Sequence, residues 1–225
     1  PPPNTSPIVG SVDVYKRQQR DSDTGGFFSA TDAESDGGEG KFYIWSYDEL
    51  ESELSPSEFS TAEAILGVTS QGNFEGDNVL WRRSDVEQQT GKSVDQLLKK
   101  LAKLRQQRTP PAVDRKVITA WNGLAISALI SGFEATNEPH YQQIALQVAD
   151  LLWRNSYSTK DGLARIHTSE QRIDAALDDY SNIIRAYLDV FDITGDDTWL
   201  SRAEVLTERM LRDFLDDTTL SLIHI

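Results

Sequence analysis

The chain repeats itself after 58 positions, and this repeat limits the fold more than any other feature. Residues 121–153, moved forward from position 121 to position 179, align with residues 179–211. The aligned positions lie mostly three to five residues apart, as on one face of a helix. They pair Ile126 with Ile184, Ala128 with Ala186, Phe133 with Phe191, Thr136 with Thr194, Tyr141 with Trp199 and Ala145 with Ala203.

Each copy predicts a helix, a polar turn and a second helix. The turns read TNEP and TGDD, where Pro139 or the Asp196–Asp197 pair suits the first turn of a helix. A repeat made of two helices is typical of solenoids and α/α toroids. We therefore predict a mainly α fold, a partial α/α toroid built of helical hairpins with short β-hairpins in the connecting loops.

The apolar pattern divides the four helices into inner and outer ones. Residues 117–136 are apolar on nearly all sides, whereas residues 141–153 carry a one-sided apolar stripe. We predict that 117–136 and 180–194 are inner helices, and that 141–153 and 199–214 are outer helices. Phe133 and Phe191 are then expected at equivalent core positions.

Two aromatic runs precede the repeat, at residues 23–30 and 41–45, with an acidic loop between them. This pattern predicts a β-hairpin with a long acidic tip. Residues 32–37 imitate the start of an EF-hand loop, but Tyr43 stands where the bidentate glutamate is required. An EF-hand is therefore excluded. A weaker cation site and a solvated acidic tip are the alternatives, and we predict no metal ligand.

Further helices and one strand are indicated between these landmarks. Capping-box patterns begin at Ser46, Ser55 and Ser84. Residues 94–104 form an amphipathic helix, and residues 163–166 read as a strand in the long connection between the two repeat copies.

Composition excludes several classes of partner. The net charge of −14 disfavours nucleic acid and anionic membranes, and the basic residues in 99–108 fit a solvated helix face. The chain has no cysteine, so disulfides and thiolate chemistry are excluded. The longest apolar run, residues 117–130, is too short to span a bilayer, and no signal peptide is visible. We expect a cytoplasmic protein without a cofactor.

The two ends differ in character from the rest. Residues 1–20 are expected to be a non-native or disordered leader, and residues 218–225 a non-native tail. Residues 21–217 are expected to form a fragment of one toroid domain, because they contain fewer hairpins than a closed ring. Such an excerpt should be inactive and should expose apolar faces, around Ile183, Tyr187 and Leu206 and near Phe27 and Tyr43.

Acidic residues before the inner helices are the candidates for catalysis. General acid and base carboxylates flank the scissile bond in glycoside hydrolysis. We select Asp32, Glu34, Asp178 and Asp179 as catalytic candidates, with Asp114 as a further carboxylate. For the pair at 178–179, the alternative is a role in capping the following helix and stabilising its dipole.

Aromatic and amide side chains are the candidates for substrate binding. The residues that could stack on sugar rings are Trp45, Trp81, Trp121 and Tyr180. Asn122 lies beside Trp121 at the start of an inner helix. The alternative for each aromatic residue is a place in the core. A sugar epimerase using histidine chemistry is a third hypothesis, for which only His140 and His167 are available.

Several motifs in fixed order resemble one family. They are GGFFSATDAES with GEGKFYIW, GNFEGDNVLWRR, DRKVITAWNGLAI and LDDYSNIIRAYLDVFDITGDDTWL. Together they resemble the thioredoxin-domain-containing proteins of the spermatogenesis-associated type, over residues 22–217. Departures from the family pattern are Glu34 in place of aspartate, Ala120 in place of serine and Ala125 in place of methionine.

The resemblance implies a thioredoxin-like N-terminal domain followed by a six-hairpin glycosidase-like toroid, of which this chain would be an internal piece. It carries over no settled reaction. The leading hypothesis is carbohydrate processing or binding by the intact protein, with a carbohydrate or other small molecule as the ligand. The alternative is a non-catalytic scaffold domain that accompanies the missing thioredoxin-like domain of the same parent chain.

Overall fold

The structure, a computed structural model, describes residues 20, 25–90, 94–167, 171–216, 218–219 and 221–222. The expected leader, residues 1–20, therefore lies almost wholly outside the described residues. The chain divides into two compact units. Unit 1 contains Pro1–Ala30 and Val113–Ile225, and unit 2 contains Thr31–Ala112. Each unit has a hydrophobic core of its own.

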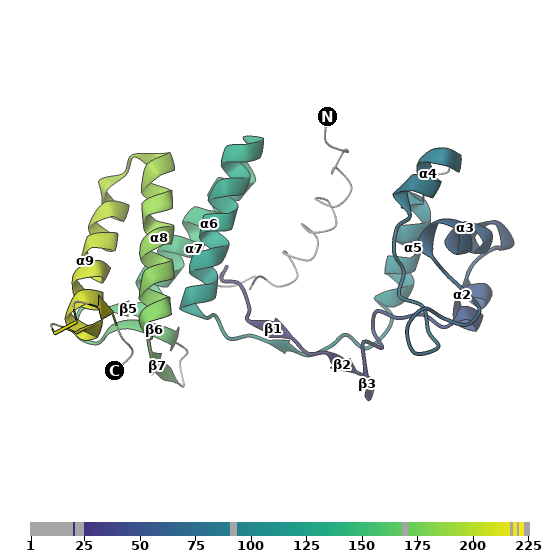
Figure 1. The fold of residues 1–225 in the computed structure, drawn as a ribbon, viewed down its shortest axis with the longest axis horizontal. Helices are drawn as coiled ribbons and strands as arrows, with labels where there is room; N and C mark the ends of the chain where they lie inside the picture. The colour runs from purple at the N-terminus through teal and green to yellow at the C-terminus, as the bar shows by residue number, and fades with distance from the viewer. Residues whose placement is uncertain are drawn as a thin grey trace. The chain divides into compact units, whose positions relative to one another are not determined.

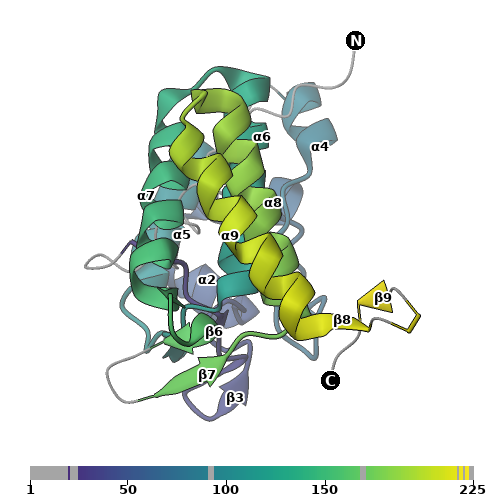
Figure 2. The same cartoon turned by 90° about the vertical axis from the view of Figure 1, so that its left-hand side faces the viewer.

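Unit 1 is built of two helical hairpins (Figures 1 and 2). The first consists of α6 (Thr119–Thr136) and α7 (Pro139–Ser156), and the second of α8 (Leu177–Thr194) and α9 (Asp197–Phe214). Helix α6 packs against α7 and α8, and α8 packs against α9. The predicted fold class is confirmed: the chain is mainly α, with helical hairpins and short β-hairpins in the connections.

The two hairpins turn in the same way. Asn137 ends α6 and Gly195 ends α8, both in the left-handed region with φ of 55° and 66°. Their N–H groups donate to the carbonyls of Phe133 and Phe191, at 2.7 Å in each case. Both phenylalanine side chains are half-buried, so the equivalent positions predicted for them lie at the edge of the core rather than inside it. Each lies in the last turn of its helix, beside the exposed polar turn.

The first helix of each hairpin is the more buried one, as predicted. Seven residues of α6 and six of α8 are buried, against five of α7 and three of α9. Ile183, Tyr187 and Leu206 are 0%, 1% and 0% exposed, so the expectation that they form an open apolar face is wrong. They fill the core between the helices instead.

Helix α6 is not enclosed on all sides, although its sequence is apolar all round. One of its faces packs on α7 and α8, whereas Trp121 and Leu124 on the other side are 49% and 55% exposed. The close approach to α8 occurs at Gly123, where an added Cβ would lie 2.9 Å from the carbonyl carbon and oxygen of Asn182. Only glycine allows the two backbones to come so near.

A three-stranded antiparallel sheet joins the two hairpins. It contains β5 (Tyr157–Ser158), β6 (Gly162–His167) and β7 (Arg172–Asp174), in that order. Strand β6 confirms the strand predicted in the connection. The sheet lies at the end of the hairpins from which α8 starts (Figures 1 and 2). At the C-terminal side, β8 (Leu215–Asp216) pairs with β9 (Ser221–Leu222).

Among the described residues the two aromatic runs do not pair with each other, so the predicted β-hairpin with a long acidic tip is wrong. Phe27 bridges to Arg20, and Trp45 bridges to Asn78. The acidic loop folds on itself instead, because β2 (Glu34–Ser35) pairs with β3 (Gly38–Glu39) around a turn in which Asp36 and Gly37 are left-handed. Strand β1 (Ala30–Thr31) pairs with β4 (Val113–Asp114).

The helices described in unit 2 are α2 (Tyr47–Glu53), α3 (Pro56–Leu66), α4 (Ser84–Thr90) and α5 (Asp95–Arg105). The capping box predicted at Ser55 forms in full: Glu58 N–H donates to the Ser55 hydroxyl and Ser55 N–H donates to the Glu58 carboxylate. At Ser46 only the serine half of the box is present. No helix in the described part of the chain is long and apolar enough to cross a membrane.

Candidate functional site

The carboxylate of Asp179 is fully buried where α6, α8 and β6 meet. Its Oδ1 accepts the backbone N–H of Ala120 at 2.9 Å. Its Oδ2 accepts the backbone N–H of Ala176 and the Nη1 of Arg165, both at 3.0 Å. Asp179 is 0% exposed, and its three donors all belong to the chain itself. This carboxylate therefore holds the first turns of α6 and α8 to each other and to β6.

The neighbouring carboxylate, Asp178, shares the same arginine but faces solvent. Arg165 Nη1 lies 3.1 and 3.2 Å from its two oxygens, and the Asp178 side chain is 47% exposed. The attraction of Asp179 is the main cause that raises the pKa of Arg165, against the opposing effect of burial, and Asp178 adds to it. Arg165 stays charged and ties both carboxylates to the sheet.

Asn122 and Tyr180 also make buried contacts with the backbone. The Asn122 amide accepts the N–H of Phe27 at 2.8 Å and donates to its carbonyl at 3.0 Å, as a neighbouring strand would. Tyr180 is 3% exposed, and its hydroxyl accepts the N–H of Leu163 at 3.1 Å. Burial raises the pKa of Tyr180, so the hydroxyl stays protonated. Both side chains hold neighbouring segments in place.

Trp121 is the exposed member of this group. It lies in the first turn of α6, between Ala120, whose N–H is held by Asp179, and the buried Asn122. Trp121 itself is 49% exposed. The backbone is thus fixed on both sides, while the indole ring is accessible.

Asp32, Glu34 and Trp45 belong to unit 2, whereas Asp114 belongs to unit 1 and forms an ion pair with Lys116 at 2.7 Å. Asp32 and Glu34 are exposed, and the Asp32 carboxylate accepts the N–H of Glu34 at 3.1 Å in a local turn. Trp45 is 3% exposed in the core of that unit, so its ring offers little surface for stacking on a ligand. The structure brings together five candidates of unit 1 at the starts of α6 and α8, namely Trp121, Asn122, Asp178, Asp179 and Tyr180.

Of the two candidate histidines, only His140 has a side chain among the described residues. His140 packs against the ring of Tyr141, with a centroid distance of 4.0 Å. The side chain of His167 lies outside the described residues. In the described part of the chain, no three or more His, Asp or Glu side chains gather so as to hold a metal ion.

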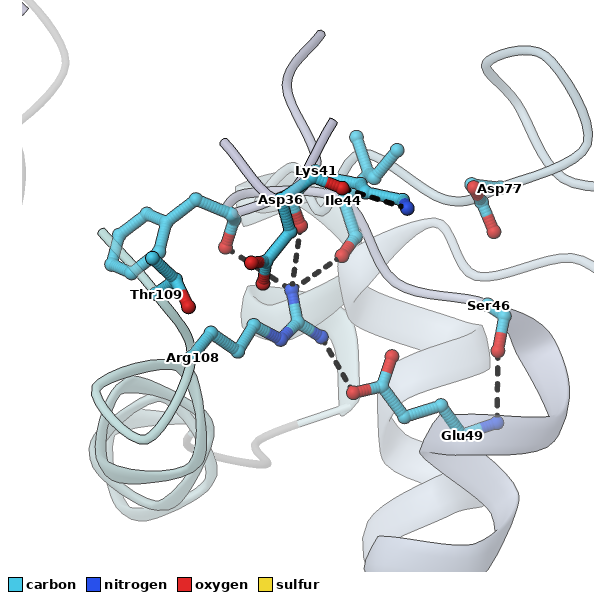
Figure 3. Close-up of a pocket in the computed structure, with 9 residues that line it drawn as sticks. Asp36, Lys41, Ile44, Ser46, Glu49, Asp77, Arg108 and Thr109 are labelled. Carbon is cyan, nitrogen blue, oxygen red and sulfur yellow. Dashed lines mark hydrogen bonds and ion pairs between the residues drawn. The ribbon is translucent and has the colours of Figure 1, made fainter. Parts of the chain in front are cut away.

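Sequence reasoning missed the two arginines that organise these regions. Arg165 stands in β6, 13 residues before Asp178 and with β7 between them, so no local pattern in the sequence pointed to this pairing. Arg108 was expected on a solvated helix face, which is wrong: α5 ends at Arg105, and Arg108 turns inward. Its Nη1 donates to the carbonyls of Lys41, Phe42 and Ile44, and its Nη2 to Glu49. A cavity of about 330 Å³ opens beside it (Figure 3).

Comparison with known proteins finds relatives but no family model that matches. An uncharacterised protein of Caenorhabditis elegans is 29% identical over 235 residues, which cover 85% of this chain and 32% of that protein. Spermatogenesis-associated protein 20 of Homo sapiens is 26% identical over 256 residues, covering 94% of this chain and 33% of the relative. The mouse protein of the same name is 26% identical over 238 residues, covering 86% and 30%. The chain thus spans about a third of the length of these relatives.

Solved structures with a similar arrangement include carbohydrate enzymes. A GH76 α-mannanase of Bacteroides thetaiotaomicron has a TM-score of 0.45 and 17% identity, covering 49% of this chain and 31% of the enzyme. Cellobiose 2-epimerase of Bacillus thermoamylovorans has a TM-score of 0.47 and 11% identity, covering 98% and 58%. That of Spirochaeta thermophila has a TM-score of 0.43 and 14% identity, covering 95% and 57%. The fold class of this chain rests on its own helices and their pairing.

Proposed function

We propose that the intact protein binds a carbohydrate at the end of unit 1 where α6 and α8 begin. The observation that supports this is Trp121, 49% exposed on a backbone that buried hydrogen bonds hold on both sides. An indole ring in the first turn of a fixed helix can stack on the apolar face of a sugar ring. Because the backbone beneath it is already ordered, binding loses little conformational freedom there.

The polar groups beside Trp121 favour binding over hydrolysis. A glycosidase needs one protonated carboxyl and one free carboxylate on opposite sides of the scissile bond. Asp179 is buried beneath three donors, and Asp178 is paired with the same Arg165 that Asp179 contacts. These contacts commit both carboxylates to partners within the chain rather than to a scissile bond. The exposed edge of Asp178 is then available to accept hydroxyl groups of a ligand.

In this proposal the hairpins form part of a six-hairpin glycosidase-like toroid in a longer cytoplasmic protein, with a thioredoxin-like domain before it. The supporting facts are the repeated hairpins and the relatives that exceed this chain about threefold in length.

The test uses the intact protein, an array of immobilised glycans and a titration with each glycan that binds. Replacing Trp121→Ala should weaken binding at least about tenfold, the scale of losing one aromatic contact. The matched control is Leu124→Ala, which removes a side chain of similar exposure from the same helix but no ring. Thermal unfolding of both variants shows whether the fold is kept. Binding that Trp121→Ala leaves unchanged would contradict the proposal.

A non-catalytic scaffold is the second candidate. Three of the candidate residues favour it, because their buried side chains bond to backbone groups of the chain itself. They are Asp179, Asn122 and Tyr180. If the intact protein binds no glycan, and a Trp121→Ala variant instead loses a contact with the thioredoxin-like domain in cross-linking, this candidate replaces the first.

A further inference from the structure

Unit 2 contains a polar cavity of about 330 Å³ that is separate from the Trp121 region (Figure 3). This volume lies at the lower end of the range found for small-molecule sites. Its polar lining includes the side chains of Asp36, Lys41, Glu49, Asp77 and Arg108.

Arg108 makes one wall of the cavity rigid. Its Nη1 lies 2.7 Å from the Ile44 carbonyl and 3.1 Å from the Phe42 carbonyl, and its Nη2 lies 2.6 Å from a carboxylate oxygen of Glu49. The guanidinium also lies over the buried Trp45 ring, 3.9 Å from the centroid. A planar group with this many partners is fixed, and it fixes the backbone that it contacts.

Two tight turns present the other carboxylates. Asp36 occupies the left-handed turn between β2 and β3, with φ of 49°. Asp77 closes a turn with Phe74, in which each residue's N–H donates to the other's carbonyl at 2.9 Å. The next residue, Asn78, pairs with Trp45 in both directions at 2.7 and 2.9 Å. The carboxylates therefore project from a backbone that is already ordered.

Three charged side chains at the cavity, those of Lys41, Asp36 and Asp77, can still form hydrogen bonds with a ligand. The Lys41 ammonium contacts the Asp36 carbonyl at 3.3 Å, and no carboxylate within ion-pair distance is found for it among the described residues. In Figure 3 its nitrogen points toward the side of Asp77, and no interaction joins the two groups. The carboxylates of Asp36 and Asp77 likewise have no ion-pair partner among the residues that the structure describes.

The balance of these groups selects the chemistry of the ligand. An anion would meet the carboxylates of Asp36, Glu49 and Asp77, and a cation would meet the Lys41 ammonium and Arg108. The described residues do not gather as a metal site. A neutral polyhydroxylated molecule suits all of them, because each hydroxyl can donate to a carboxylate and accept from the ammonium.

We propose that this cavity is a second binding site for a neutral sugar, held by Lys41 and Asp77 and positioned by Arg108. The proposal rests on the proposed function for the ligand class, but it concerns different residues in a different unit. The two are therefore separable by residue-specific measurements.

The experiment follows backbone amide signals of the full chain by NMR during titration with D-glucose, D-mannose or cellobiose. Binding at the cavity should shift the signals of Phe42, Ile44 and Asp77, whereas binding at the proposed unit 1 site should shift Ala120 and Trp121. Lys41→Met and Asp77→Asn should each weaken the cavity response about tenfold, since each removes a hydrogen bond to a charged group. Glu75→Gln, an exposed change in the same turn as Asp77, should leave it unchanged.

Each outcome decides one proposal. If the Phe42 and Ile44 signals do not move with any sugar, the cavity proposal is overturned, whatever happens at Trp121. Shifts there with putrescine or citrate but not with sugars would overturn the ligand class. Equal responses in the wild type, Lys41→Met and Asp77→Asn would overturn the assigned contacts. Shifts confined to the cavity would support this site while contradicting the one at Trp121.

Discussion

The Asp179 carboxylate accepts the backbone N–H of Ala120 at 2.9 Å, and this bond joins the first turn of α8 to the first turn of α6. Residue 120 is 59 positions away in sequence, so the contact links the two repeat copies. Asp179 also binds Arg165 and the N–H of Ala176, so this one buried side chain connects α6, β6 and the start of α8.

Replacing Asp179→Asn should destabilise the protein by about 2–4 kcal/mol, because the amide keeps one acceptor but presents an NH2 group to the remaining donors. Asp178→Asn is the matched control. Its carboxylate contacts the same arginine but is 47% exposed, so solvent screening limits the expected loss to about 1 kcal/mol or less. Urea unfolding of the three proteins measures both values. Equal losses for the two variants would show that the burial of Asp179 does not increase its contribution to the free energy of unfolding.

Gly123→Ala should destabilise unit 1 although alanine is the better helix former. The new Cβ would lie 2.9 Å from the backbone of Asn182, so α6 and α8 would have to separate, at a cost of about 1–3 kcal/mol. In the same helix, Gly132→Ala places its Cβ 3.6 Å from the Tyr141 ring, an ordinary contact. That variant should be neutral or more stable by up to about 1 kcal/mol. Thermal unfolding distinguishes them, and a stabilising Gly123→Ala would contradict the close packing.

The capping box of α3 should make stability depend on pH in the acid range. Hydrogen bonds from Lys100, and then from the Ser55 backbone, lower the pKa of Glu58 from 4.5 to about 2. A lowered carboxyl pKa stabilises the fold above the unfolded value of 4.5, and this contribution is lost as the pH falls toward 2. The urea midpoint of the wild type should therefore exceed that of Glu58→Gln at pH 6, and the gap should close by about pH 2. A gap that stays constant with pH would show that the ionisation of Glu58 is not its source.

Local patterns were enough to predict the hairpins of unit 1. The repeat and its polar turns gave four helices, and Thr136 and Thr194 show how closely the copies agree. Their hydroxyls donate to the carbonyls of Gly132 and Val190, four residues earlier, at 2.7 and 2.8 Å. Periodicity and turn chemistry act within a few residues, so they are legible in one sequence.

The side-chain partners could not be predicted in this way. Asp178 and Asp179 are adjacent and chemically identical, yet one is half exposed and the other is enclosed, because successive residues of a helix point in different directions. Which of them faces inward depends on where α6 and β6 lie. In the same way, Trp45 pairs with Asn78 rather than with the first aromatic run, a choice made by tertiary packing.

The most direct test of the proposed function observes the Trp121 ring itself. Labelling the intact protein with 5-fluorotryptophan gives a fluorine signal for each tryptophan, including the five of this chain, and Trp121→Phe assigns the one of interest. During titration of the intact protein with a glycan that it binds, the Trp121 signal should shift in a saturable manner. The signal of Trp199, which is 7% exposed in the core of unit 1, should stay in place. A glycan that binds while the Trp121 signal does not move would contradict the account.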